Sequence, residues 1–385
     1  MNRKIPLAWL QVSREKNRLL IAIAGIAFAD ILMFLQLGFR SALYDSNTRM
    51  HRSLRADLVL VSPQARNIVN MSSFLRSRLY QAMSFEGVES ADALYTEETG
   101  KWRVPQTRRN SPILVLGFNP EKSVFTLPGV NQNLDKIKLP NSFLFDRGSR
   151  GEYSSTIAEI EQGKTVVTEI EGRRIEVSGL FNVGASFAAD GNLITSDTNF
   201  LRLFPKHKAG EISAGLITLK PGIDPQKMAA ILKASLPNDV KVLTKSEFVE
   251  FEKNYWANNT PIGFIFSLGT GIGFIVGVVI VYQIIYSDVS EHLAEYATLK
   301  AMGYKDIYLF GIVFQEAIIL AIIGYLPACA ISVVLYVLTR TATNLPLFMT
   351  VNRALFVLAL TILMCLISAM IAMRKLRAAD PADIF

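Results

Sequence analysis

Residue types that could do chemistry occur in several places, but each place lacks the pattern that the chemistry needs. The GKT triplet at 163–165 has the end of a phosphate-binding loop, yet Ala158 stands where that loop needs its first glycine, and a predicted strand follows instead of a helix. The GASFA stretch at 184–188 misses the last glycine of a nucleophile elbow. The glycines of GTGIG at 269–273 lie inside an apolar run, and this context excludes a dinucleotide site.

The histidines and cysteines do not suggest a metal site or a disulfide. His51, His207 and His292 lie far apart in the sequence, with no spacing typical of metal ligands. Cys329 and Cys365 both lie inside apolar runs, so the polar part of the chain must fold around its own core. We therefore expect a chain that is not an enzyme, does not hydrolyse ATP by itself, and has no cofactor and no nucleic-acid partner.

Apolar residues gather in four runs, each long enough to cross a membrane. A helix needs about 20 apolar residues to span a bilayer. The first run is too long for a cleaved signal peptide, and we interpret it as a retained anchor. The sequence predicts an α-helical membrane protein with four transmembrane helices and a large α+β domain inserted between helices 1 and 2. The expected spans are 19–39, 262–286, 307–338 and 354–373.

The net charge of +7 is informative through its placement. Residues 1–18, expected to form an amphipathic helix at the membrane interface, are mostly basic in their charges, and so is the tail at 374–385. Four spans put both ends on the same side, and the basic flanks predict that this side is the cytoplasm. The insertion at 40–260 and the short loop at 339–353 are then expected outside.

The insertion predicts short strands mixed with helices. Turn residues Glu171 and Gly172 separate two strand-like stretches and predict a hairpin. Residues 88–96 and 102–104 are expected as separate short strands, and 121–154, rich in Pro, Asn, Gly and charge, as loops or an inserted lobe. Whether the domain has one lobe or two stays open.

A polar segment, 287–306, separates the second and third spans, and it has helix start and stop signals of its own. Asp288 with Glu291 predicts a capping box, and Gly303 after Met302 predicts the end of the helix. A helix at the mouth of two spans is a place where a soluble partner could push on them. A solvated connector is the alternative interpretation.

Two features inside the spans have a functional and a structural interpretation. Asp30 is costly at that depth, so it is expected to face another helix or water, either as a gating group or as a hydrogen-bonded carboxyl that packs the bundle. Gly269, Gly273 and Gly277 recur every four residues, which predicts a close packing seam between helices, with a dimer interface as one possible location.

Several motifs resemble those of the MacB/FtsX superfamily of ABC-transporter permeases. EHLAEYATLKAMGYKDIYL is similar to the coupling segment of that superfamily, FQEAIILAIIGY to the start of its third span, and AMRKLRAADPADIF to its terminus. The second motif places Glu316 near the ATPase side. Within the superfamily, GIAFADILMFLQLGFRSALYDS, FNPEKSVFTLPGV and GLFNVGASFAADGNLITSD look closest to the cyanobacterial DevC-type permeases.

This resemblance implies an inner-membrane permease with a periplasmic domain that works by mechanotransmission. The implied partners are a second copy of the permease, a separate DevA-like ABC ATPase, a membrane-fusion adaptor of the DevB/HlyD type, and a TolC-like outer-membrane channel. The implied cargo is a glycolipid or another hydrophobic envelope substrate, and membrane lipid surrounds the spans. The residues expected to contact the ATPase or to close the coupling helix are Glu291, His292, Glu295, Tyr296, Lys300, Met302 and Gly303.

Other functions remain open at this point. The chain could be a lipoprotein-releasing permease or an FtsX-like regulator of a cell-wall hydrolase, both from the same superfamily. A sensor whose exported domain binds a ligand is a candidate from a different class.

Overall fold

The computed structural model describes residues 16–151 and 153–378, which divide into two compact units. The helical unit contains the described residues up to Ser41, Ile262–Arg340 and the described residues from Leu347 onward. The sheet unit contains Ala42–Pro261 and Thr341–Pro346. Most of the amphipathic helix expected at 1–18, and the end of the tail expected at 374–385, lie outside the described residues.

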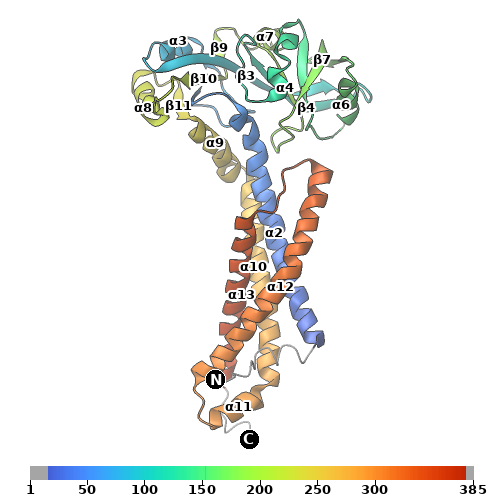
Figure 1. Ribbon diagram of the computed structural model, residues 1–385, viewed down its shortest axis with the longest axis vertical. Coiled ribbons are helices and arrows are strands. Elements are labelled where there is room, and N and C mark those ends of the chain that lie inside the picture. Colours follow the sequence, from blue (N-terminus) through green and yellow to red (C-terminus); the bar gives the residue numbers. More distant parts are fainter. Residues whose placement is uncertain (1–15, 152, 379–385) are drawn as a thin grey trace. The chain divides into compact units, whose positions relative to one another are not determined.

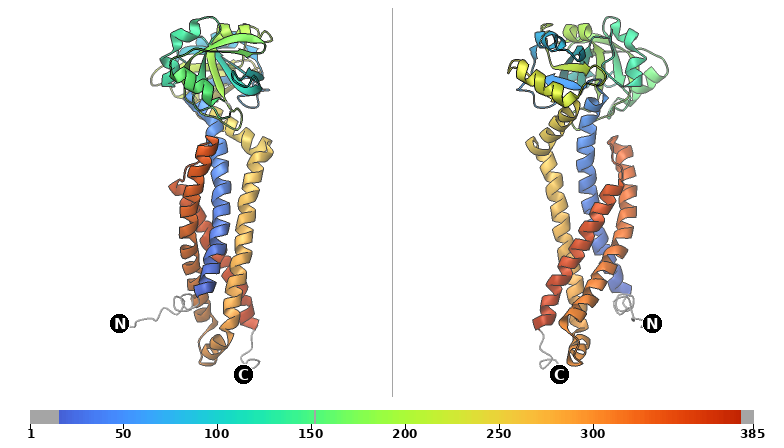
Figure 2. Two further views of the ribbon diagram at one scale, coloured as in Figure 1. Left: turned by 90° about the vertical axis from the view of Figure 1, so that its right-hand side faces the viewer. Right: turned by 60° about the vertical axis from the view of Figure 1, so that its left-hand side comes forward.

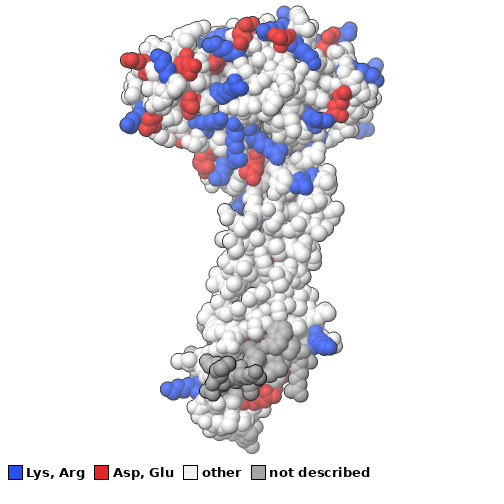
Figure 3. Space-filling model, viewed as in Figure 1, with Lys and Arg blue, Asp and Glu red and all other residues white. Residues whose placement is uncertain are grey.

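The helical unit is built from long apolar helices that run side by side (Figures 1 and 2). In the described part of the chain, four helices are long and apolar enough to cross a membrane, and each expected span falls within one of them. The visible surface of this unit is almost free of charged side chains (Figure 3), as a bilayer requires. The helices are α2 (Lys16–Ser53), α10 (Pro261–Glu291), α12 (Asp306–Thr343) and α13 (Val351–Ala378), with the short α11 (Leu293–Ala301) between α10 and α12.

The sheet unit has the expected α+β composition, but one sheet of nine strands runs through it, which makes it one lobe. The strand order is β11-β1-β10-β3-β4-β8-β5-β7-β6. Its strands are β1 (Leu58–Val61), β3 (Val88–Arg103), β4 (Asn110–Phe118), β5 (Ser142–Asp146), β6 (Val166–Ile170), β7 (Arg173–Phe181), β8 (Asn192–Ser196), β10 (Ala214–Leu219) and β11 (Lys241–Thr244); β2 (Phe74–Leu75) and β9 (Glu211–Ile212) pair separately.

Short helices cover this sheet or connect its strands. Asp224 caps α8, and Thr244 with Glu247 forms a capping box at the start of α9, so both helices begin at side chains that accept backbone hydrogen bonds. The helices are α3 (Ser77–Met83), α4 (Pro128–Asn131), α5 (Leu134–Lys138), α6 (Ser154–Glu161), α7 (Asp197–Leu203), α8 (Pro225–Ser235), α9 (Lys245–Asn254) and the π-helical η1 (Tyr255–Asn259).

Part of the sheet closes on itself. Strands β3, β4, β8, β5, β7 and β6 follow one another, and Trp102 of β3 pairs with Ile170 of β6, which completes a ring. Trp102, Phe145 and Tyr153 fill its interior, with ring centroids 5.2–6.4 Å apart, and Trp102 is fully buried. Aromatic packing of this kind provides a core without disulfides.

The sequence prediction fails in two places within this sheet. Residues 121–154 are not an irregular lobe, because they contain α4, α5 and the central strand β5. All five β5 residues are buried, so the strand shows no alternation of polar and apolar residues that would have revealed it. The stretches expected as two strands at 88–96 and 102–104 form the single strand β3. The hairpin prediction is confirmed, since β6 and β7 pair across Glu171 and Gly172, which have φ of 51° and 74°.

A buried polar contact joins the end of α2 to α9 inside the sheet unit. His51 and Glu252 are both fully buried, and their Nε2 and Oε2 atoms are 3.2 Å apart. The Glu252 carboxylate also accepts hydrogen bonds from the backbone N–H of Ile68 and from Trp256 Nε1, both at 2.8 Å. One carboxylate therefore holds α2, α9, η1 and the loop at 62–73 together.

We expect Glu252→Ala to destabilise the sheet unit by about 2–5 kcal/mol, because it leaves the two buried donors, Ile68 N–H and Trp256 Nε1–H, without their acceptor. Chemical unfolding of the detergent-solubilised protein, followed by tryptophan fluorescence, measures this loss. The control is Glu250→Ala, which removes an exposed carboxylate paired with Lys253 and should change stability by less than about 0.5 kcal/mol. Equal effects of the two variants contradict the role of Glu252.

Candidate functional site

The polar segment between α10 and α12 is helical, but its helix starts later than the sequence predicts. Asp288 and Glu291 do not cap a new helix, because α10 continues through both of them. Helix α11 begins after His292, and Gly303, with a φ of 91°, follows its C-cap Met302. The predicted stop signal is therefore in place, whereas the predicted start is wrong by about one turn.

Helix α11 has one face in contact with the spans and one face exposed. Tyr296 and Ala297 are buried, and Tyr296 belongs to the core formed with α2, α10, α12 and α13. Glu295 and Met302 are exposed, Met302 by 63%. Tyr296 thus holds the helix in place and is not available on the exposed face, which corrects the expectation that it contacts a partner.

A network of charged side chains fixes the end of α10 next to α11. Arg18 of α2 donates to Glu291 at 2.8 Å and lies 3.6 Å from Asp288. The His292 ring lies against the backbone carbonyl of Asp288 at 3.1 Å, while Lys300 is partly buried on α11. Glu316 of α12 is 4% exposed, and its carboxyl lies near Asp288. One arginine thus connects α2 with the end of α10 at the base of α11.

The structure brings Glu291, His292 and Glu316 together through two residues that the sequence did not identify as members of a site. Arg18 looks like one more basic residue of the N-terminal flank, and Asp288 looks like a helix cap. Both residues are charged and lie next to an apolar run, but the ion pair between Arg18 and Asp288 depends on how the helices pack. No local sequence pattern predicts a contact between residues so far apart in the chain.

The three predicted glycines pack within the chain. A Cβ on Gly269 would lie 2.5 Å from Gln36 Cδ of α2, and one on Gly273 would lie 3.3 Å from Met33 Cγ of the same helix. A Cβ on Gly277 would collide with Met364 of α13 and lie 2.9 Å from Ala29 Cβ. The seam therefore joins α10 to α2 and α13, and this removes the reason for assigning it to a contact between two protomers.

Asp30 lies fully buried among these helices. Its carboxylate accepts a hydrogen bond of 2.8 Å from Thr361 Oγ1 of α13. In the same region Tyr336 of α12 donates to the backbone carbonyl of Phe34. These polar contacts connect α2 with α13 and α12, as expected for a carboxyl that packs the bundle.

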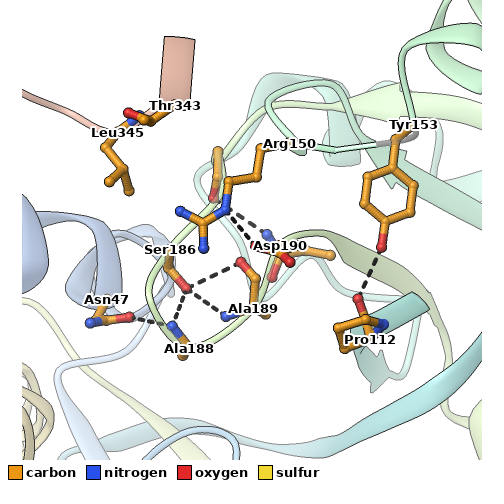
Figure 4. Close-up of polar contacts among 12 residues, drawn as sticks. Asn47, Pro112, Arg150, Tyr153, Ser186, Ala188, Ala189, Asp190, Thr343 and Leu345 are labelled. Atoms are coloured by element: carbon orange, nitrogen blue, oxygen red, sulfur yellow. Dashed lines mark hydrogen bonds and ion pairs between the residues drawn. The ribbon is translucent and has the colours of Figure 1, made fainter. Parts of the chain in front are cut away.

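The stretch at 184–188 is a structural turn. Ser186 is 8% exposed, and its Oγ accepts hydrogen bonds from the backbone N–H groups of Ala188 and Ala189 (Figure 4). The Ala188 N–H also donates to Asn47 Oδ1, and Arg49 donates to the carbonyl of Val183 at 3.0 Å. This loop therefore holds the end of α2 within the sheet unit.

The buried carboxylate of Asp146 stabilises the start of the same loop, at Val183 and Gly184. Burial raises the pKa of Asp146, while hydrogen bonds from Val183, Asn192, Gly148 and Gly184 act in the opposite direction. The two oxygens of Asp146 together accept hydrogen bonds from three backbone N–H groups and from Asn192 Nδ2. This role is structural, because the acceptor positions are occupied by the protein itself.

The triplet at 163–165 and the potential metal ligands do not form a site in the described part of the chain. The triplet at 163–165 precedes β6 and has no helix start behind it. Over residues 16–151 and 153–378, no group of three or more His, Cys, Asp or Glu side chains could hold a metal ion.

Comparison with known proteins identifies the C-terminal part of the chain. Residues 267–381 match the family model of the FtsX-like permease C-terminal domain, a segment that includes α11, α12 and α13. A comparison with curated proteins gives no match. This match supports an FtsX-like permease domain in the C-terminal part of the chain.

Two solved structures are similar to the chain at low identity. The periplasmic region of MacB from Actinobacillus actinomycetemcomitans is 12% identical, with a TM-score of 0.36 over 53% of this chain and 95% of that one. The extracellular domain of the ABC-type transporter YknZ from Gram-positive bacteria is 14% identical, with a TM-score of 0.32 over 49% of this chain and 100% of that one.

We expect Gly277→Leu to destabilise the helical unit by about 1–3 kcal/mol, because its side chain has no space between Ala29 and Met364. Thermal unfolding in detergent, followed by circular dichroism, measures the change. Gly271→Leu is the matched control on the same helix, since a Cβ there meets no atom within 4 Å. If only the Gly271 variant loses stability, the close packing of α10 at Gly277 is contradicted.

Proposed function

We propose that this chain is the permease subunit of an ABC-type exporter of the MacB/FtsX superfamily, driven by a separate ATPase. One observation carries the proposal. Helix α11 is fixed to the spans by one face, leaves its other face free, and lies inside the segment that matches the FtsX-like permease family. A helix held in this way can receive a push from a soluble partner and pass it to the spans.

The exposed face of α11 and the turn after it form the proposed docking surface. Glu295 supplies a negative charge, and Met302 and Tyr304 supply apolar area, with exposed fractions of 63% and 45% for the latter two. Such a surface suits a partner with an apolar groove and a basic rim. Of the residues expected to serve the ATPase, we retain Glu291, His292, Glu295, Lys300, Met302 and Gly303.

The charged network at the base of α11 gives the proposed stroke a path. A movement of α11 would shift the position of the last turn of α10, which carries Asp288 and Glu291, because the two helices are connected directly through His292. Arg18 connects those carboxylates to α2, and Asp288 faces Glu316 of α12. We propose that nucleotide-driven closure of the ATPase moves this network and, through it, the spans.

We propose the finer assignment to the DevC-like subfamily on its sequence motifs, and two of these motifs lie against the end of α2. In FNPEKSVFTLPGV, Val124 and Thr126 exchange backbone hydrogen bonds with residues 53–55 at the end of α2. In GLFNVGASFAADGNLITSD, Val183 and Ala188 contact Arg49 and Asn47. Both motifs thus hold the end of the same helix inside the sheet unit. We propose that they serve to receive the movement of α2.

The complete assembly follows from the resemblance. We propose two copies of this permease in the inner membrane, with a DevA-like ATPase, an adaptor of the DevB/HlyD type and a TolC-like channel. The proposed cargo is a glycolipid or another hydrophobic envelope molecule. Both termini are proposed to be cytoplasmic and the sheet unit periplasmic, because the basic flanks favour that orientation.

Glu295→Arg reverses the charge in the middle of the proposed docking surface and should weaken ATPase binding. We expect at least a fivefold lower recovery of the ATPase when the tagged protein is purified from native membranes and its partners are identified by mass spectrometry. Glu86→Arg, an exposed charge reversal in the sheet unit, is the control and should recover the ATPase normally.

The partners recovered with the unaltered protein separate the candidate functions. An ATPase together with an adaptor and an outer-membrane channel supports the exporter. A cell-wall hydrolase or lipoproteins without an adaptor favours a regulator or a lipoprotein-releasing permease. Absence of any ATPase contradicts the role of α11.

The proposed orientation predicts that cysteines placed at two exposed methionine positions lie on opposite sides of the membrane and differ in their access to a thiol reagent. Met83→Cys, in α3 of the sheet unit, should react with a membrane-impermeant maleimide in spheroplasts. Met302→Cys should react only after the membrane is opened. Both substitutions are made with Cys329 and Cys365 replaced by serine or alanine, so that the label reports the new thiol. Labelling of Met302→Cys in intact spheroplasts reverses the assignment.

A further inference from the structure

The ring of strands in the sheet unit has an open seam next to its closing pair. The contact between β3 and β6 consists of the single pair Trp102 and Ile170. Beyond it, Thr168 of β6 reaches β3 through its side chain, whose hydroxyl donates to the carbonyl of Arg103, and Pro105 has no N–H to add to a ladder. A concavity of about 340 Å³ lies in this position, between the turn after β3 and the hairpin of β6 and β7.

Arginines dominate the lining of this concavity. Arg103 comes from the end of β3, Arg108 from the turn that follows, and Arg174 from β7. The only acidic residue of the lining is Glu169, which pairs with Arg103 at 2.5 Å. Three positive charges against one negative leave two positive charges unmatched in the lining.

The two arginines that carry this excess have no carboxylate partner. Within residues 16–151 and 153–378, no ion pair holds Arg108 or Arg174. Arg108 also adopts a φ of 53°, a left-handed conformation that is costly for a residue with a Cβ. This conformation belongs to the turn between β3 and β4, in which the Arg108 N–H donates to the carbonyl of Val104, and it fixes the backbone from which the side chain leaves.

We propose that this concavity binds a ligand that carries a phosphate group on a small polar body such as a sugar. A phosphate monoester has close to two negative charges at neutral pH, which matches the two unmatched guanidinium groups. Guanidinium groups also form paired hydrogen bonds with phosphate oxygens. The volume lies at the lower end of small-molecule sites and leaves room for more than the phosphate.

This site is independent of the proposed coupling role of α11. The ligand is held by residues of β3, β6, β7 and the turn between β3 and β4, all within the sheet unit. Neither the ATPase nor a second copy of the chain is needed for binding. Failure of one proposal therefore leaves the other intact.

The test measures binding of glucose 6-phosphate to the full-length protein in a neutral detergent, by ³¹P NMR line broadening. We expect saturable broadening that weakens as ionic strength rises, because the attraction is between exposed charges. The double substitution Arg108→Gln with Arg174→Gln should weaken binding about tenfold or more, as the loss of charge-assisted hydrogen bonds predicts.

Matched controls identify the site and the source of the phosphate. Arg202→Gln, an exposed arginine of α7, should bind glucose 6-phosphate as tightly as the unaltered protein. Dihexanoyl phosphatidic acid is the second probe: tighter binding of this lipid assigns the phosphate to a lipid headgroup, and tighter binding of the sugar phosphate assigns it to a soluble ligand. No saturable binding of either probe, or equal binding by the double variant, overturns the proposal.

Discussion

Asp288 is buried at the base of the helical unit, and Arg18 provides an opposite charge beside it. Its guanidinium lies against Asp288 and Glu291, while Glu316 adds a third carboxyl on α12. Asp288 and Glu291 lie three residues apart on α10 and both approach this guanidinium, so the position of that end of α10 depends on the arginine. Helix α11 follows directly from that end of α10. The surface proposed to meet the ATPase therefore depends on a contact made by a different span.

Close approach of the helices is the second condition for this arrangement. Small residues let helix backbones approach each other where lipid offers no hydrophobic drive to associate. Gly269, Gly273 and Gly277 provide this approach for α10, and the Asp30–Thr361 hydrogen bond connects α2 with α13 nearby. The bundle is thus held by close packing at the three glycines of α10 and by isolated polar contacts between helices. Both features could be expected from residue types, but their partners could not.

The success of the sequence-based prediction follows the strength of each local signal. Long apolar runs located the four apolar helices, and the Glu171-Gly172 turn located a hairpin, because these patterns act over neighbouring residues. β5 was not predicted because a fully buried strand shows no alternation of polar and apolar residues. The helix start predicted at Asp288 was wrong because a capping pattern can also occur inside a longer helix. The ring closure at Trp102, the carboxylate of Glu252 and the Arg18 contacts join distant residues. No single-sequence pattern records such contacts.

The position of β1 has a consequence for biogenesis. This strand follows α2 directly, yet Leu58 pairs with Ile217 on one side and with Thr244 on the other. Nearly the whole insertion must therefore be synthesised before β1 gains either neighbour, and such distant pairings form slowly. Until then, the apolar Leu58–Val61 segment, fully buried in the finished unit, remains without a sheet to cover it. This segment therefore needs protection against aggregation while the chain folds, before the protein does any work.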